Sequence, residues 1–166
     1  MEPMSTRNIK LVIHYDGSAY HGWQIQPDMD TVEGKLTEVL EKLCDCDINL
    51  NGSSRTDAGV HALGQVANVR IDCLVPTENL VKALNNLLPE DITVAEAIEV
   101  PETFDAISDT KSKIYRYTIY TGPVRPVLDI RHCWHRPGIL DIKKMELAAL
   151  LLLGQHDFKS FASAAD

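Results

Sequence analysis

Residues 8–15 have the sequence NIKLVIHY, in which Ile9, Leu11 and Ile13 share one side of an extended chain. This period of two is typical of a β-strand with one buried face. Asp30 and Glu33 then have the spacing of a capping box, which marks the start of a helix. Apolar side chains follow at helical intervals, at Val32, Leu36, Val39, Leu40 and Leu43. The sequence therefore predicts a strand followed by a helix.

The next segments extend this pattern to a complete domain. Two more strands are predicted at Ile48–Asn51 and Gln65–Ile71, the second with an inward face of Ala67, Val69 and Ile71. A second helix starts at Pro76–Thr77 and stops at Pro89, and its apolar face consists of Leu80, Val81, Leu84, Leu87 and Leu88. With a fourth strand at Ile92–Ile98, this order predicts an α+β, ferredoxin-like fold. Both helices cover one face of its antiparallel sheet, and the open face of such sheets often binds RNA.

A second, related α+β domain is predicted at residues 107–166, after a first domain at residues 1–106. Lys113–Thr121 and Arg131–His135 are expected to form strands, and Asp141–Leu153 a helix. No strand is predicted after this helix, so part of its apolar face is expected to lack cover. That face contains Ile142, Met145, Leu150 and Leu153. We therefore expect a C-terminally truncated chain with an incomplete second unit.

The composition indicates a globular, cytoplasmic protein without a metal centre. Hydrophobic residues make up 45% of the chain, which is enough for a core. The longest apolar stretch, Leu147–Leu153, is too short to cross a bilayer, and Met1–Asn8 has no apolar signal core. The four cysteines show no paired metal-ligand spacing. Because His132 and His135 would lie on opposite faces of a strand, no metal is expected there either.

Charge is distributed unevenly along the chain. The net charge of −8 argues against nucleic acid as a partner, but it conceals two regions of opposite sign. Residues 1–106 hold 7 Lys and Arg against 18 Asp and Glu, whereas residues 107–144 hold 8 against 3. The basic segment contains Lys111, Lys113, Arg116, Arg125, Arg131 and Arg136. Such a segment is typical of a phosphate-contacting surface, and a solvated strand face is the alternative.

The connection between the second and third predicted strands carries the candidate site. Residues 52–61, GSSRTDAGVH, place Arg55 and Asp57 two positions apart among small side chains. In an extended segment these two side chains project from one face. The glycine and serine neighbours leave room for a ligand beside the backbone. Opposite charges on one small surface suit an anionic substrate, and an Asx turn beside a solvated arginine is the simpler alternative.

Five blocks of sequence stand out along the chain. They are YDGSAYHGWQIQ at residues 15–26, SRTDAGVHA at residues 54–62, QVA at residues 65–67, KIYRY at residues 113–117 and GQHDFKSF at residues 154–161. In order and position these blocks strongly resemble the tRNA pseudouridine synthase A family. The resemblance covers nearly all of the chain.

The resemblance implies a pseudouridine synthase fold and a tRNA substrate. It implies isomerisation of uridine to pseudouridine in the anticodon stem-loop, at tRNA positions 38 to 40, without a metal or organic cofactor. By similarity Asp57 is the catalytic carboxylate, either as nucleophile or as base on the sugar. Arg55 would occupy the space vacated by the flipped nucleotide and contact phosphate, and Tyr115 would stack on the uracil. Full-length members of the family work as homodimers.

Some positions depart from the family pattern or keep two readings. Asp105 and Ile107 stand where the family usually has His and Arg, so an acid and an aliphatic side chain replace basic groups expected near RNA. Tyr20 and Trp23 either stack on RNA or anchor their loop on the sheet. The alternatives to catalysis are a non-catalytic RNA-binding fragment of ferredoxin-like fold and a regulatory domain that binds a small ligand.

Overall fold

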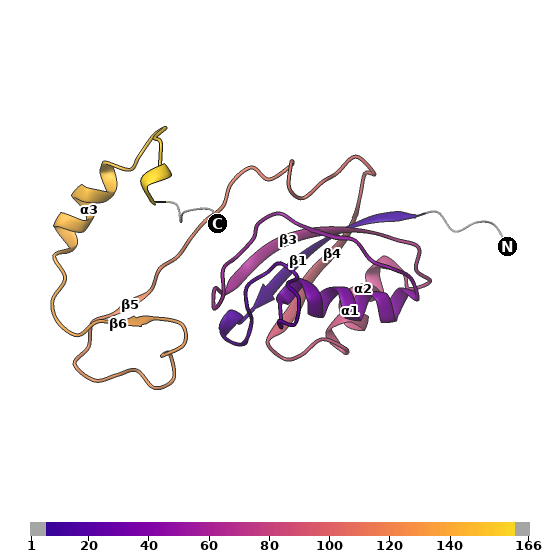
Figure 1. Cartoon of the computed structure of the whole chain (residues 1–166), viewed down its shortest axis with the longest axis horizontal. Helices are drawn as coiled ribbons and strands as arrows, with labels where there is room; N and C mark the ends of the chain where they lie inside the picture. The colour runs from indigo at the N-terminus through magenta and orange to yellow at the C-terminus, as the bar shows by residue number, and fades with distance from the viewer. Residues whose placement is uncertain (1–5, 162–166) are drawn as a thin grey trace. The chain divides into compact units, whose positions relative to one another are not determined.

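The computed structural model describes residues 6–161, which form two compact units. The first unit extends to Ile114 and the second begins at Tyr115, and each is considered separately below. Figure 1 labels most of their helices and strands. Within the described range, none of the helices combines the length and the apolar character that a membrane span requires.

The first unit has the predicted order of strands and helices. Its sheet is antiparallel throughout, with the strand order β2-β3-β1-β4, and α1 and α2 lie side by side across one face (Figure 1). The ferredoxin-like prediction is therefore confirmed. The elements are β1 (Arg7–Tyr15), α1 (Val32–Cys44), β2 (Leu50–Gly52), β3 (Ala62–Ile71), α2 (Thr77–Asn85) and β4 (Ile92–Val100).

The core lies between this sheet and the two helices. Ile9, Leu11 and Ile13 of β1 are completely buried, as their alternation predicted. Each such side chain contributes about 1.5–3 kcal/mol relative to exposure. The helices and the neighbouring strand supply the facing side chains, which include Leu36, Leu40, Leu80, Leu84, Ala67, Val69 and Ile71. This packing fixes the two central strands, whose ends carry the loops of the candidate site.

The predicted capping box at the start of α1 is wrong by one residue. Thr31, with extended backbone, is the N-cap, and its hydroxyl accepts a hydrogen bond from Gly34 N. Asp30 instead forms an ion pair with Lys35 at 2.6 Å. The Glu33 carboxylate accepts from the Ile25 amide at 2.9 Å, so it stabilises the preceding loop rather than the helix end.

The second helix ends earlier than the predicted stop at Pro89. After Asn85, the last residue of α2, the chain turns towards β4. The Asn85 amide group donates to Val94 O at 2.9 Å and accepts from Val94 N at 2.8 Å, which ties the helix end to that strand. As a result Leu88 is in the core, whereas Leu87 is 42% exposed.

Two buried asparagines on the other face of the sheet hold the segment that follows β4. Asn8 donates to Pro101 O at 3.0 Å and to Phe104 O at 2.9 Å. Asn68 donates to Asn8 Oδ1 at 3.0 Å and accepts from Ala106 N at 2.9 Å. Part of the face that was predicted to be open is therefore covered by residues 101–106.

The second unit contains less regular structure than predicted. Its strands are β5 (Ile119–Tyr120) and β6 (Trp134–His135), which pair in parallel. The prediction of a strand from Lys113 to Thr121 is therefore wrong over residues 113–118, and the one at Arg131–His135 holds only for its last two residues. Residues 113–117 are exposed and pair with no strand within the described range, so they lack the hydrogen-bonding partner that a sheet requires. Thr118, directly before β5, only accepts a hydrogen bond from Trp134 N at 2.8 Å.

The helix of the second unit, α3 (Ile142–Leu150), is shorter than predicted and its apolar face is exposed. Asp141 caps its start by accepting from Lys144 N at 3.0 Å. Beyond Leu150 the chain tightens into bonds between residues three apart, such as Leu153 N to Leu150 O at 3.3 Å. The expected lack of cover is observed: the exposed fractions of Ile142, Met145, Leu150 and Leu153 are 56%, 45%, 60% and 69%.

Candidate active site

Residues 53–61 form the loop between β2 and β3, and a tight turn within it carries Asp57. The Val60 amide donates to Asp57 O at 3.2 Å, which closes the turn. Gly59 has a φ of +77°, a left-handed conformation that favours glycine. At the start of the loop, Ser53 N donates to Val66 O at 2.8 Å and continues the pairing of the strands. The loop therefore has a defined conformation rather than that of a free connection.

Thr56, directly before Asp57, is anchored to the core. Its carbonyl accepts from Trp23 N at 3.0 Å, and its hydroxyl bonds the Tyr15 hydroxyl at 2.8 Å. Gly22 has a φ of +91°, and a Cβ at that position would overlap the Thr56 carbonyl. This close approach explains the glycine in the block at residues 15–26. The loop after β1 thus fixes the backbone next to Asp57.

Arg55 and Asp57 are brought together at an open pocket of about 350 Å³. Both side chains are exposed to solvent. The pocket is lined by His21, Gln24, Gln26, Arg55, Thr56, Asp57 and Ala58. Tyr115 is the first residue of the second unit, is 77% exposed, and is not one of these lining residues.

Within residues 6–161, neither Arg55 nor Asp57 takes part in an ion pair. The two charged groups share a pocket without neutralising each other. This leaves the guanidinium available to an anion and the carboxylate available as a nucleophile or base. An arrangement of this kind suits a substrate that carries phosphate next to a reactive centre.

The pocket also contains three polar residues to which the sequence assigned no role: His21, Gln24 and Gln26. They belong to the loop after β1 and form one wall of the pocket, whereas the other lining residues belong to the loop between β2 and β3. Gln26 Nε2 donates to His21 O at 2.9 Å, which braces this wall internally. The sequence contains a hint of this role, because the three polar residues lie on both sides of Gly22. Only the contact between the two loops in the structure shows which pocket they line.

Tyr20 and Trp23 anchor their loop and do not present a stacking surface. They are only 6% and 2% exposed. The Tyr20 hydroxyl donates to Asp91 Oδ1 at 2.6 Å, and burial together with this carboxylate raises the pKa of Tyr20 well above its ordinary value. The Trp23 ring lies 6.1 Å from the Tyr15 ring, centroid to centroid. Of the two readings of these aromatics, the structural one holds.

Asp105 and Ile107, which depart from the family pattern, have different environments. The Asp105 carboxylate accepts from Ser108 N at 2.9 Å and from Ile107 N at 3.1 Å, so it caps a turn. These hydrogen bonds, foremost that from the Ser108 amide, lower the pKa of Asp105. The Ile107 side chain is 61% exposed. Asp105 thus has a local structural role, which explains an acid at this position.

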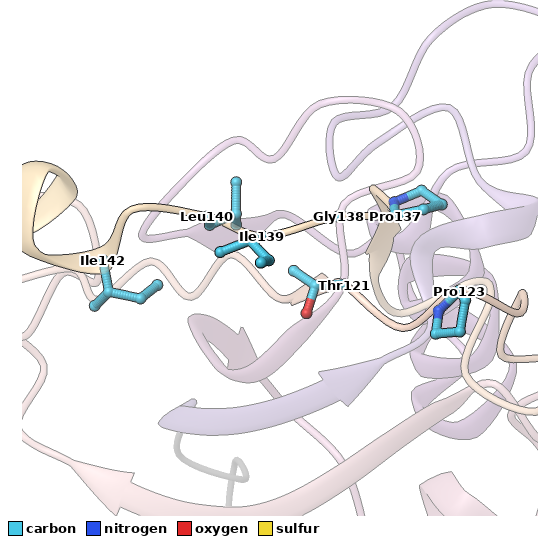
Figure 2. A pocket seen from close by; sticks show the side chains of 7 residues that line it. All are labelled: Thr121, Pro123, Pro137, Gly138, Ile139, Leu140 and Ile142. Carbon is cyan, nitrogen blue, oxygen red and sulfur yellow. The ribbon is translucent and has the colours of Figure 1, made fainter.

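The second unit contains a larger pocket of about 490 Å³, shown in Figure 2. None of its lining residues carries an ionisable side chain; they are Thr121, Pro123, Pro137, Gly138, Ile139, Leu140 and Ile142. The pocket therefore lacks ionisable groups for acid–base chemistry. The four cysteines of the chain are free thiols.

Comparison with known proteins defines the class to which this fold and pocket belong. A sequence model of the tRNA pseudouridine synthase family matches residues 11–107, which is more than half of the chain. The matched range contains Arg55, Asp57 and all the other residues that line their pocket. The chain therefore belongs to the tRNA pseudouridine synthase family.

The similar curated proteins are named more specifically, as tRNA pseudouridine synthase A. The protein of Caldicellulosiruptor bescii is 44% identical over 158 residues, and that of Geotalea daltonii 46% identical over 158 residues. Each comparison covers 95% of this chain and 65% of the relative. For the protein of Citrifermentans bemidjiense, 46% identical, the covered shares are 95% and 63%. The chain thus spans somewhat less than two thirds of the length of these relatives.

Proposed function

We propose that the protein isomerises uridine to pseudouridine in tRNA, in the anticodon stem-loop at tRNA positions 38 to 40, with Asp57 as the catalytic carboxylate. The observation that carries the proposal is that Arg55 and Asp57 line one open pocket within the segment that matches the family. The names of the relatives supply the substrate class.

The isomerisation moves one glycosidic bond. The bond from C1′ of the ribose to N1 of uracil breaks, and a bond from C1′ to C5 forms after the base has rotated. The proton on C5 leaves, and N1 gains a proton. Substrate and product are isomers, so atoms balance without a metal, redox cofactor or co-substrate. Asp57 acts on the sugar, as nucleophile at C1′ or as base, and both routes use its ionised form.

The reaction requires the nucleotide to leave its stack, which costs a few kcal/mol. Arg55 lies two residues before Asp57 and is exposed at the same pocket. Its planar guanidinium fills the space that the flipped nucleotide vacates and binds phosphate. Tyr115 stacks on the uracil, where an aromatic ring contributes about 1–3 kcal/mol and tolerates rotation of the base. We further propose that the full-length protein is a homodimer that binds tRNA in the cytoplasm.

The test measures pseudouridine formed in unmodified tRNA by the protein expressed from its complete gene. Carbodiimide labelling followed by mass spectrometry locates the product. Asp57→Asn is expected to abolish the reaction, because the amide is neither a nucleophile nor a base. Asp47→Asn, on an exposed residue outside the pocket, is the control and should retain activity. Activity that survives Asp57→Asn would refute the assignment.

A non-catalytic RNA-binding protein is the second candidate, and the exposed basic side chains of residues 107–144 favour it. This candidate predicts salt-dependent binding of tRNA without any pseudouridine formed by the wild-type protein. The same assay, with a parallel binding measurement, separates the two functions.

A further inference from the structure

We infer that His61 is a positioning residue for the turn that carries Asp57. It holds the C-terminal end of the turn in place, whereas Thr56 holds the N-terminal end. The inference rests on the proposed function, since it concerns the placement of the same carboxylate. His61 lies four residues after Asp57, at the end of the turn, and is not among the residues that line the pocket. It acts on the site only through the backbone of the loop.

The imidazole of His61 is tied to the segment directly after β1. Its Nδ1 atom lies 3.1 Å from the Gly17 amide nitrogen, which donates to it, and 2.9 Å from Asp16 Oδ1. An unprotonated Nδ1 accepts from Gly17, and a protonated Nδ1 donates to Asp16. Either form of the ring therefore connects the end of the loop to the same short segment.

The partner segment is itself rigidly held. Asp16 Oδ1 also accepts from Ser18 N at 2.9 Å, and the Asp16 amide donates to Asp91 O at 2.9 Å. Gly17 is buried, and a Cβ there would overlap the Val60 carbonyl. The backbone after β1 and the backbone before His61 thus lie in direct contact, and the histidine bond forms where this contact is closest.

Asp57 consequently lies between two anchored positions. On one side Thr56 is bonded to Trp23 and Tyr15. On the other side Gly59 N donates to Tyr20 O at 3.2 Å, and His61 provides the side-chain bond. Without the imidazole the Thr56 anchor and the backbone bond of Gly59 remain, but the end of the turn loses its side-chain bond and gains freedom to shift. A displacement of about 1 Å at a reacting group lowers a rate about 10²-fold.

The experiment compares three substitutions in the protein expressed from its complete gene. His61→Ala removes the tether. His61→Asn places an amide atom at the position of Nδ1 and retains the bond to Gly17, whereas His61→Gln moves its amide one bond farther out. We expect His61→Ala and His61→Gln to lower kcat at least about 10-fold, with KM for tRNA changed less than about 3-fold. His61→Asn should recover kcat to within about 3-fold of wild type.

A second readout does not depend on activity. Amide hydrogen exchange of residues 57–60 should accelerate in His61→Ala and return towards wild type in His61→Asn, while exchange in β1 stays unchanged. Unchanged exchange at residues 57–60 in His61→Ala would overturn the inference, whatever the activity. So would a kcat that is the same in the Asn and Gln variants. A wild-type protein that forms no pseudouridine would instead refute the proposed function and leave the exchange test decisive for His61.

Discussion

Gly52 leaves the space that the Trp23 ring occupies beside the loop at residues 53–61. A Cβ at Gly52 would overlap the indole ring of Trp23, which is 2% exposed and bonds Thr56 through its amide. Gly52→Ala is therefore expected to lower the free energy of unfolding by about 1–3 kcal/mol, as overpacking does, and to lower pseudouridine formation by displacing Thr56. Gly64→Ala is the matched control, because nothing lies within 4 Å of its Cβ position. Urea unfolding should show a change of less than about 0.5 kcal/mol for the control; equal stabilities of the two variants would contradict the packing argument.

The sequence predicted the pocket in part because its chemistry is local. Arg55 and Asp57 lie two residues apart, so any ordered loop places them near each other. The roles of His61 and of the polar lining residues His21, Gln24 and Gln26 were not predicted. They depend on contact between loops about 40 residues apart in the sequence, and the periodicity of apolar residues does not encode such contacts. The error at Asp30 concerns a single position: Thr31 caps the helix, whereas Asp30 forms an ion pair with Lys35.

The segment after β4 is attached to the sheet by the side-chain hydrogen bonds of two asparagines, Asn8 and Asn68. Asn68 is completely buried, and Asn68→Ala would leave both Asn8 Oδ1 and Ala106 N without their partner. Because each unsatisfied buried group costs about 1–3 kcal/mol, we expect the free energy of unfolding to fall by about 2–4 kcal/mol. Asn79→Ala, on the exposed side of α2, should change it by less than about 0.5 kcal/mol. Urea denaturation of both variants tests this difference, and a loss at Asn68 no larger than at Asn79 would show that the segment needs no such attachment.

Elements were predictable where one of their faces is buried. β1, α1 and β3 carry a clear period because they pack on a common core, and the sequence predicted their inward faces correctly. In the second unit, by contrast, no residue from 115 to 161 is fully buried. Residues 113–117 pair with no strand of the described range, and the apolar residues after Leu150 have no buried surface on which a longer helix would pack. The residue pattern alone therefore predicted more strand and helix in the second unit than the structure contains.

On the scale of the whole chain, the pocket residues and the basic segment lie in sequence regions of opposite net charge. The acidic residues 1–106 carry Arg55 and Asp57, while the exposed basic side chains gather in residues 107–144. An acidic region repels the phosphate backbone, so the affinity for tRNA should come mainly from the basic segment. This division accounts for a protein with a net charge of −8 in a family that acts on tRNA.

The salt dependence of tRNA binding tests this division of charge. Arg116→Gln and Lys42→Gln change the net charge by the same amount, but Arg116 lies in the basic segment and Lys42 lies exposed on α1 in the acidic region. Each lost phosphate contact reduces the slope of log K against log salt by about 1. We expect that reduction for Arg116→Gln and an unchanged slope for Lys42→Gln when the Kd for tRNA is measured between roughly 50 and 200 mM salt. Equal slopes in the two variants would mean that net charge, rather than the basic segment, determines the affinity for tRNA.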